Sequence, residues 1–156
     1  PERVRALVLS DTGARIGSLD SWKQRIEIVQ TGGLHALQEP TMERWFSRSF
    51  RQRHAAAIRG YSTMLLKVAP EGYIGTCCAL RDADFHATAS RIKAPTLVLC
   101  GAEDIATPPE LGQELTNLIA GSKFSLIEGS GHLPCIEKPV EVAEHMMKFF
   151  REVHIV

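Results

Sequence analysis

The chain has 156 residues, 44% of them hydrophobic, and its 18 Lys and Arg residues balance 18 Asp and Glu residues. This length and apolar content suit one folded domain and exclude a disordered chain. The zero net charge gives no reason to expect nucleic acid or a membrane surface as a partner. No apolar run approaches the ~20 residues that are needed to cross a bilayer.

The first predicted element is a strand at 4–10, with the sequence VRALVLS. The segment 18–84 follows it and contains no convincing strand; its apolar residues fall at helical spacings in short pieces separated by Gly32-Gly33, Pro40 and Pro70. This segment predicts a small helical subdomain. Within it, RWFSRSFRQRHAAAIR carries arginines and no acidic residue, which indicates either a solvated helix face or a surface that attracts an anionic ligand.

Two further strands are predicted downstream, PTLVLCG at 95–101 and KFSLIEG at 123–129. Like the first, each is an apolar run that ends in small or polar residues, as buried parallel strands do where they open into a loop. Helical patterns follow at 108–121, which begins with prolines, and at 138–153, which repeats apolar residues at spacings of three and four. This alternation predicts an α/β fold with three parallel strands.

Two residues that are suited to proton transfer follow the second and third strands. Asp104 lies in the loop AEDIATPPE, and His132 lies in the loop SGHLP. Ligands bind at the carboxyl edge of open α/β sheets, and neighbouring strands are about 4.8 Å apart, so the two side chains can meet there. An aspartate that accepts the Nδ1 proton leaves Nε2 of the imidazole free to act as a general base.

The segment IKAPTLVLCGAEDIATPPE, together with GSGHLP, resembles the carboxyl-terminal half of an α/β-hydrolase, in which the catalytic order is nucleophile, acid, histidine. The stretches LVLSDTGARIG, ERWF and GYIGTCCALRDADF are similar to the 3-oxoadipate enol-lactonases. The resemblance implies a hydrolase core strand and loop at 1–17, a helical cap at 18–84 and the carboxyl-terminal core at 85–156. It also implies Asp104 and His132 as the catalytic acid and histidine, without a metal or cofactor.

One part of the family pattern is absent from the sequence. The nucleophile motif G-x-S-x-G does not occur, because Ser62, Ser122 and Ser130 stand in other contexts. We therefore expect an upstream hydrolase segment, in the same polypeptide or in a partner chain, to supply the serine, and we expect the chain alone to be inactive. Cys135 as an internal nucleophile, and a metal site at His132 and Cys135, are weaker alternatives.

The resemblance implies hydrolysis of 3-oxoadipate enol-lactone to 3-oxoadipate, a step in aromatic compound catabolism. For this small anionic substrate, the candidate binding residues are Arg15, Arg44 and Arg81, since a guanidinium can hold a carboxylate with two hydrogen bonds, and Trp45 as a wall of the site. A carboxylesterase, a C–C bond hydrolase or a noncatalytic half-hydrolase module are the alternatives. Four cysteines without a CxxC motif, and no signal-like amino terminus, favour a reduced cytoplasmic setting.

Overall fold

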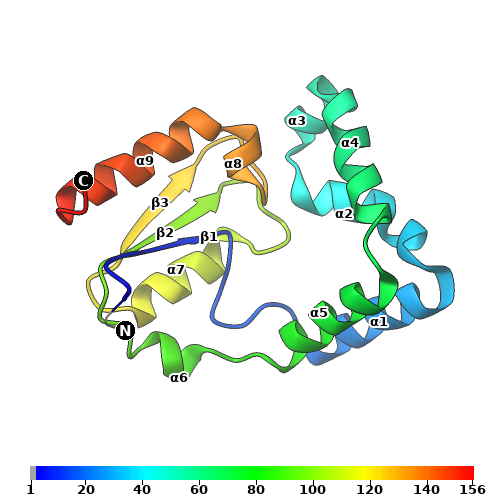
Figure 1. Ribbon diagram of the computed structural model, residues 1–156, viewed down its shortest axis with the longest axis horizontal. Coiled ribbons are helices and arrows are strands. Elements are labelled where there is room, and N and C mark those ends of the chain that lie inside the picture. Colours follow the sequence, from blue (N-terminus) through cyan, green and yellow to red (C-terminus); the bar gives the residue numbers. More distant parts are fainter. Residues whose placement is uncertain (1–2) are drawn as a thin grey trace.

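A computed structural model describes residues 3–156, and its centre is a sheet of three parallel strands in the order β1-β2-β3 (Figure 1). The strands are β1 (Leu7–Ser10), β2 (Thr96–Gly101) and β3 (Lys123–Ile127). The three predicted strands are therefore confirmed, with shorter ends. Every residue of β2 is buried, whereas β1 and β3 are partly exposed. The sequence predicts buried strands throughout, but in the described part of the chain β1 and β3 have a neighbour on one side only.

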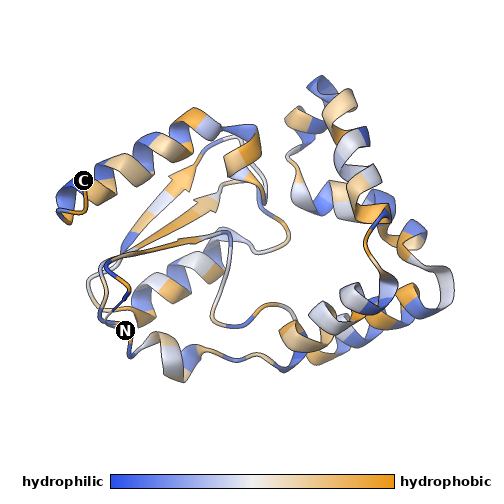
Figure 2. Ribbon diagram, viewed as in Figure 1, coloured by the Kyte–Doolittle hydropathy of each residue, from blue (hydrophilic) through white to orange (hydrophobic). Residues whose placement is uncertain are grey.

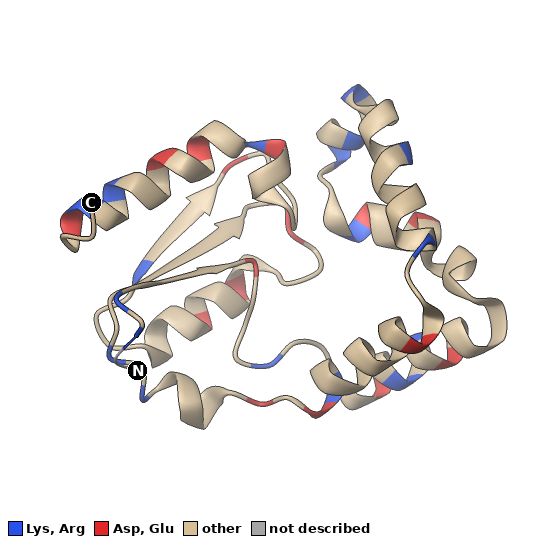
Figure 3. Ribbon diagram, viewed as in Figure 1, with Lys and Arg blue, Asp and Glu red and all other residues tan. Residues whose placement is uncertain are grey.

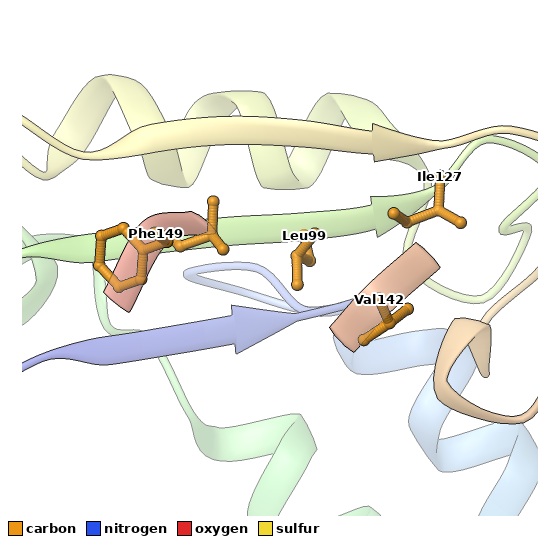
Figure 4. Close-up of a cluster of buried hydrophobic side chains, with 5 residues drawn as sticks. Leu99, Ile127, Val142 and Phe149 are labelled. Carbon is orange, nitrogen blue, oxygen red and sulfur yellow. The ribbon is translucent and has the colours of Figure 1, made fainter. Parts of the chain in front are cut away.

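Two helices cover opposite faces of the sheet: α7 (Pro109–Leu118) and α9 (Pro139–Glu152) (Figure 1). Alternate residues of β2 divide between these faces, because successive side chains of a strand point to opposite sides. Leu97 and Leu99 pack with α9, through its Val142 and Phe149. Figure 4 shows Leu99 and Ile127 of the sheet beside these two α9 side chains. These helices confirm the two patterns predicted at 108–121 and 138–153.

The chain between β1 and β2 is helical, as the sequence predicts. Its elements are α1 (Leu19–Gly32), the 3₁₀ helix η1 (Leu34–Leu37), α2 (Gln38–Trp45), α3 (Arg48–Arg53), α4 (Ala55–Leu66), α5 (Pro70–Asp82) and α6 (His86–Ala89). In Figure 1, α1 and α5 lie side by side, and α2, α3 and α4 form a second group. Each group has a small apolar core, around Val29 and Leu37 in the first case and around Phe46 and Phe50 in the second.

The colour patterns follow this architecture. Figure 2 shows apolar residues along the strands, and alternating apolar and polar residues along α7 and α9, as expected for helices with one face on a sheet. Figure 3 shows only basic residues among the charged positions of α3 and α4. Within residues 3–156, none of the helices has both the length and the apolar character that crossing a membrane requires.

Candidate active site

The loops that follow β2 and β3 bring Asp104 and His132 together. Nδ1 of His132 lies 2.9 Å from Oδ2 of Asp104, although the residues are separated by 28 positions in the sequence. The pairing arises because the two strands are parallel and adjacent, so that their carboxyl ends open at the same edge of the sheet. The contact that the sequence predicts between these two side chains is thus present.

Asp104 is completely buried at its side chain and receives hydrogen bonds on both carboxylate oxygens. The backbone N–H groups of Ala106 and Thr107 donate to Oδ1 at 2.7 and 3.0 Å, and the Thr107 hydroxyl donates to Oδ2 at 2.7 Å. Burial by itself would raise the pKa of Asp104, but the hydrogen bond and charge of His132, with the Thr107 hydrogen bonds, outweigh it and the pKa is lowered. The carboxylate is therefore held ionised and in one orientation.

The hydrogen bond to Asp104 determines how the His132 imidazole can act. With Nδ1–H donating to the carboxylate, the neutral ring carries its free lone pair on Nε2. The side chain is 24% exposed and forms part of the wall of a cavity of about 320 Å³. Among residues 3–156, no hydroxyl or thiol is hydrogen-bonded to Nε2. The pair can accept a proton from a group that enters this cavity.

Close backbone packing explains the glycines around His132. A Cβ atom on Gly101, at the end of β2, would overlap the carbonyl oxygen of Gly131, and a Cβ atom on Gly131 would lie 2.8 Å from the backbone nitrogen of Ser47. Gly129 has a φ of 64°, which glycine adopts without strain. The loop that carries His132, called the histidine loop, therefore packs closely between the end of β2 and the start of α3. Residues larger than glycine do not fit at positions 101 and 131.

The cavity lies between this edge of the sheet and the helical insertion, which is the helical chain between β1 and β2. Its walls include two of the four predicted binding residues. Arg44 and Trp45, both on α2, line it. Arg15 and Arg81 are not among the lining residues. Arg15 lies 3.7 Å from Asp84, and Arg81 is paired with the adjacent Asp82.

Sequence reasoning missed Arg25, which lines the cavity from α1 together with Trp22. The spacing of three residues within a helix places these two side chains on one face, which is a signal that the sequence contained. Nε of Arg25 donates to the Tyr73 hydroxyl at 2.8 Å, and its Nη2 donates to Thr41 Oγ1 at 3.1 Å. These contacts hold the guanidinium in place.

Arg25 and Arg44 place two positive charges in the cavity wall, on the side of the helical chain. Arg44 donates to the carbonyl oxygen of Ala106 at 3.4 Å. In the part of the chain that the structure describes, neither guanidinium lies within ion-pair distance of a carboxylate. Burial and the nearby positive charge of Arg25 lower the pKa of Arg44. An anion in the cavity would act against both effects, because a nearby negative charge favours the protonated guanidinium.

The sequence leaves two other kinds of chemistry as alternatives, a metal site and a cysteine nucleophile, and the structure shows where their side chains lie. Asp11, Asp104 and His132 offer ligand atoms within 4.8 Å of one another, so their spacing suits a cation. However, both oxygens of Asp104 already accept hydrogen bonds, which fits an acid–histidine pair better than a metal centre. Cys135, the alternative nucleophile, is exposed on α8 (Pro134–Glu137) and does not line the cavity.

Known structures share this architecture. The enol-lactonase from Burkholderia xenovorans superposes with a TM-score of 0.91 at 31% identity, covering 96% of this chain and 57% of that one. A thermophilic esterase from Thermogutta terrifontis superposes with a TM-score of 0.87 at 29% identity, covering 97% and 57%. The chain therefore has the fold of the carboxyl-terminal part of an α/β-hydrolase.

Comparison of the sequence with curated proteins finds relatives that share one named activity. The chain is 32% identical over 153 residues to 3-oxoadipate enol-lactonase 2 of Acinetobacter baylyi, covering 96% of this chain and 57% of that protein. 3-Oxoadipate enol-lactonase 1 of the same organism is 28% identical over 151 residues, covering 97% and 56%. No protein-family model matches. The chain is thus homologous to 3-oxoadipate enol-lactonases over nearly its whole length, and it spans little more than half of theirs.

Proposed function

We propose that this chain supplies the acid and the histidine of a Ser-His-Asp hydrolase that opens a carboxylate-bearing enol-lactone. The observation that carries the proposal is the Asp104–His132 pair, with its 2.9 Å hydrogen bond at the edge of a cavity. The homology to 3-oxoadipate enol-lactonases supports 3-oxoadipate enol-lactone as the substrate and 3-oxoadipate as the product.

The nucleophile in this proposal is a serine from a segment outside the 156 residues, in the same polypeptide or in a partner chain. Two observations support it: the chain spans 57% of the Acinetobacter enol-lactonase 2, and Nε2 of His132 has no hydroxyl or thiol partner among residues 3–156. In addition, β1 pairs with β2 along one side only in the described chain, so its other side can receive a further strand.

The reaction then follows from the two side chains. His132 takes the serine proton through Nε2 as the serine oxygen attacks the lactone carbonyl, and Asp104 stabilises the resulting imidazolium. The proton passes to the leaving enol oxygen when the ring carbon–oxygen bond breaks, and the enol becomes a ketone. Water, activated by His132, hydrolyses the acyl-enzyme and releases the open-chain keto acid.

A substitution of His132 tests this role. In the protein that contains the serine, we expect His132→Ala to lower kcat for 3-oxoadipate enol-lactone by about 10⁴-fold, because the general base is lost. The control is His35→Ala, since His35 does not line the cavity. Turnover of His132→Ala within tenfold of the unsubstituted enzyme would remove His132 from the mechanism.

Arg25 and Arg44 are the proposed receptor for the substrate carboxylate. We expect Arg44→Gln to raise KM for the lactone by about 10- to 100-fold, because a charge-assisted hydrogen bond is lost. KM for a neutral aryl ester should change by less than threefold. The exposed Arg48, on α3, offers the control Arg48→Gln. Equal effects on both substrates would show that Arg44 does not recognise charge.

Carboxylesterase activity is the second candidate, favoured by the 29% identity to the Thermogutta terrifontis esterase. Comparison of kcat/KM for the enol-lactone and for p-nitrophenyl acetate separates the two. A preference of more than 100-fold for the lactone supports the first proposal, and a preference for the aryl ester supports the second.

A further inference from the structure

Asp11 is a third ionisable group beside the Asp104–His132 pair. It follows β1 directly and has a φ of 49°, a conformation that is uncommon for residues other than glycine and often found at functional sites. Its backbone N–H donates to the carbonyl oxygen of Leu99 at 2.8 Å, and its Oδ1 accepts a hydrogen bond from the Gly101 N–H at 2.8 Å. The end of β2 therefore fixes both the backbone and the carboxylate.

The position of this carboxylate relates it to the catalytic pair. Asp11 is 7% exposed and lines the same cavity as His132. Ligand atoms of Asp11, Asp104 and His132 all lie within 4.8 Å of one another. Asp104 occupies Nδ1 of the ring, and no hydrogen bond joins Asp11 to His132 among the described residues. Asp11 can therefore influence the imidazole through its charge.

The protonation of Asp11 depends on the same surroundings. Burial raises the pKa of Asp11 to about 6, and the negative charge of Asp104 acts in the same direction; hydrogen bonds from Ser10 and Gly101, and the positive charge of His132, act in the opposite direction. At neutral pH the group is mainly ionised. The other titratable or charged groups around it are Cys100 on β2 and, across the cavity, Arg25, Arg44, Tyr73 and Cys77.

We propose that Asp11 is a positioning residue of the hydrolase site, whose carboxylate stabilises the protonated form of His132 across less than 5 Å without bonding to it. The proposal rests on the proposed function, because it takes His132 as the base. A negative charge at this distance in a partly buried site attracts the positively charged ring, because solvent screens the pair less than it would in bulk water. Asp104 thus orients the ring, and Asp11 adds to the negative charge that the imidazolium meets.

The direct test is an NMR titration of the His132 ring, which requires no turnover. We expect Asp11→Asn to move the titration midpoint of that ring to lower pH by about one unit, since asparagine keeps the size and an oxygen acceptor but has no charge. Asp20→Asn, which removes a carboxylate that is 95% exposed on α1, should leave the midpoint unchanged. Equal midpoints in the unsubstituted protein and Asp11→Asn would overturn the proposal, whatever the substrate proves to be.

A second measurement covers the case in which Asp11→Asn does not fold. In the unsubstituted protein with ¹³C-labelled aspartate, the Asp11 carboxyl signal should titrate in two steps, the second at the pH where the His132 ring titrates. A single step at another pH would contradict the coupling.

In the active enzyme, Asp11→Asn should lower kcat about tenfold without raising KM. An unchanged kcat and an unchanged pH profile would count against the proposal.

Discussion

Single side chains at this site are defined by local hydrogen bonds and by partners that are distant in the sequence, such as His132 for Asp104. Asp104 accepts hydrogen bonds from the Thr107 hydroxyl and from two backbone N–H groups. Its pKa is lowered in the folded protein, so its ionised form stabilises the fold. That contribution is present above the unfolded-state pKa and is lost as the pH falls through the lowered folded-state pKa. Asp11 behaves in the opposite way, since burial raises its pKa to about 6.

The sign of the Asp11 effect gives a stability prediction. The model-compound pKa is 3.8, so a folded-state pKa of about 6 makes ionisation of Asp11 destabilise the fold by about 3 kcal/mol above pH 6, and by nothing at low pH where the group is protonated in both states. We expect Asp11→Asn to increase the free energy of unfolding by about 2–3 kcal/mol at pH 7.5 and to leave it nearly unchanged at pH 4. Urea unfolding at both pH values measures this. A difference that is independent of pH would show that Asp11 ionises normally.

Among the secondary-structure elements, α8 is four residues long but connects the helical insertion to the histidine loop. Oε1 of Glu137, its last residue, accepts hydrogen bonds from the backbone N–H groups of Gly131 at 2.9 Å and Ser47 at 3.1 Å. Oε2 accepts the Ser47 hydroxyl. One carboxylate therefore ties the loop that carries His132 to the start of α3 (Arg48–Arg53), so the wall of the cavity and the catalytic ring are fixed to each other.

Removal of the Glu137 hydrogen bonds should lower the stability of the fold. We expect Glu137→Ala to lower the free energy of unfolding by about 2–4 kcal/mol, because two backbone N–H groups and a hydroxyl lose their acceptor. Glu137→Gln, which keeps one oxygen acceptor, should lose less than half as much. Urea unfolding measures both, with Glu144→Gln, at an exposed site on α9, as the control. Equal losses in the alanine and glutamine variants would mean that the link is not made by hydrogen bonds.

In the whole molecule, the cavity is built from segments that are far apart in the chain. Its walls come from the loop after β1, from α1, α2 and α5 of the insertion, and from the loops after β2 and β3. The sheet beneath it has the strand order β1-β2-β3, with α7 and α9 on its two faces, so within the described chain β1 and β3 each pair with β2 alone (Figure 1). Such edges are sites where further strands pair.

The proposed upstream segment can be detected by mass. The 156 residues amount to 17.2 kDa. If the serine belongs to the same polypeptide, we expect intact-mass spectrometry of the native protein under denaturing conditions to give a species well above that value. If a partner supplies it, a second polypeptide with G-x-S-x-G should accompany a 17.2 kDa species. A 17.2 kDa species without any partner would contradict both forms of the proposal.

Local patterns in the sequence determined the three strands, α7, α9 and the pairing of Asp104 with His132. Strand and helix periodicity is local, and parallel order alone brings the ends of adjacent strands together. The limits of the helical subdomain stay a prediction. Only the tertiary structure decided that Arg25 and Arg44 line the cavity while Arg15 and Arg81 do not, and that Asp11 is buried beside His132. Burial and cavity lining depend on which distant segments pack together, and the spacing of residues along one segment does not contain that information.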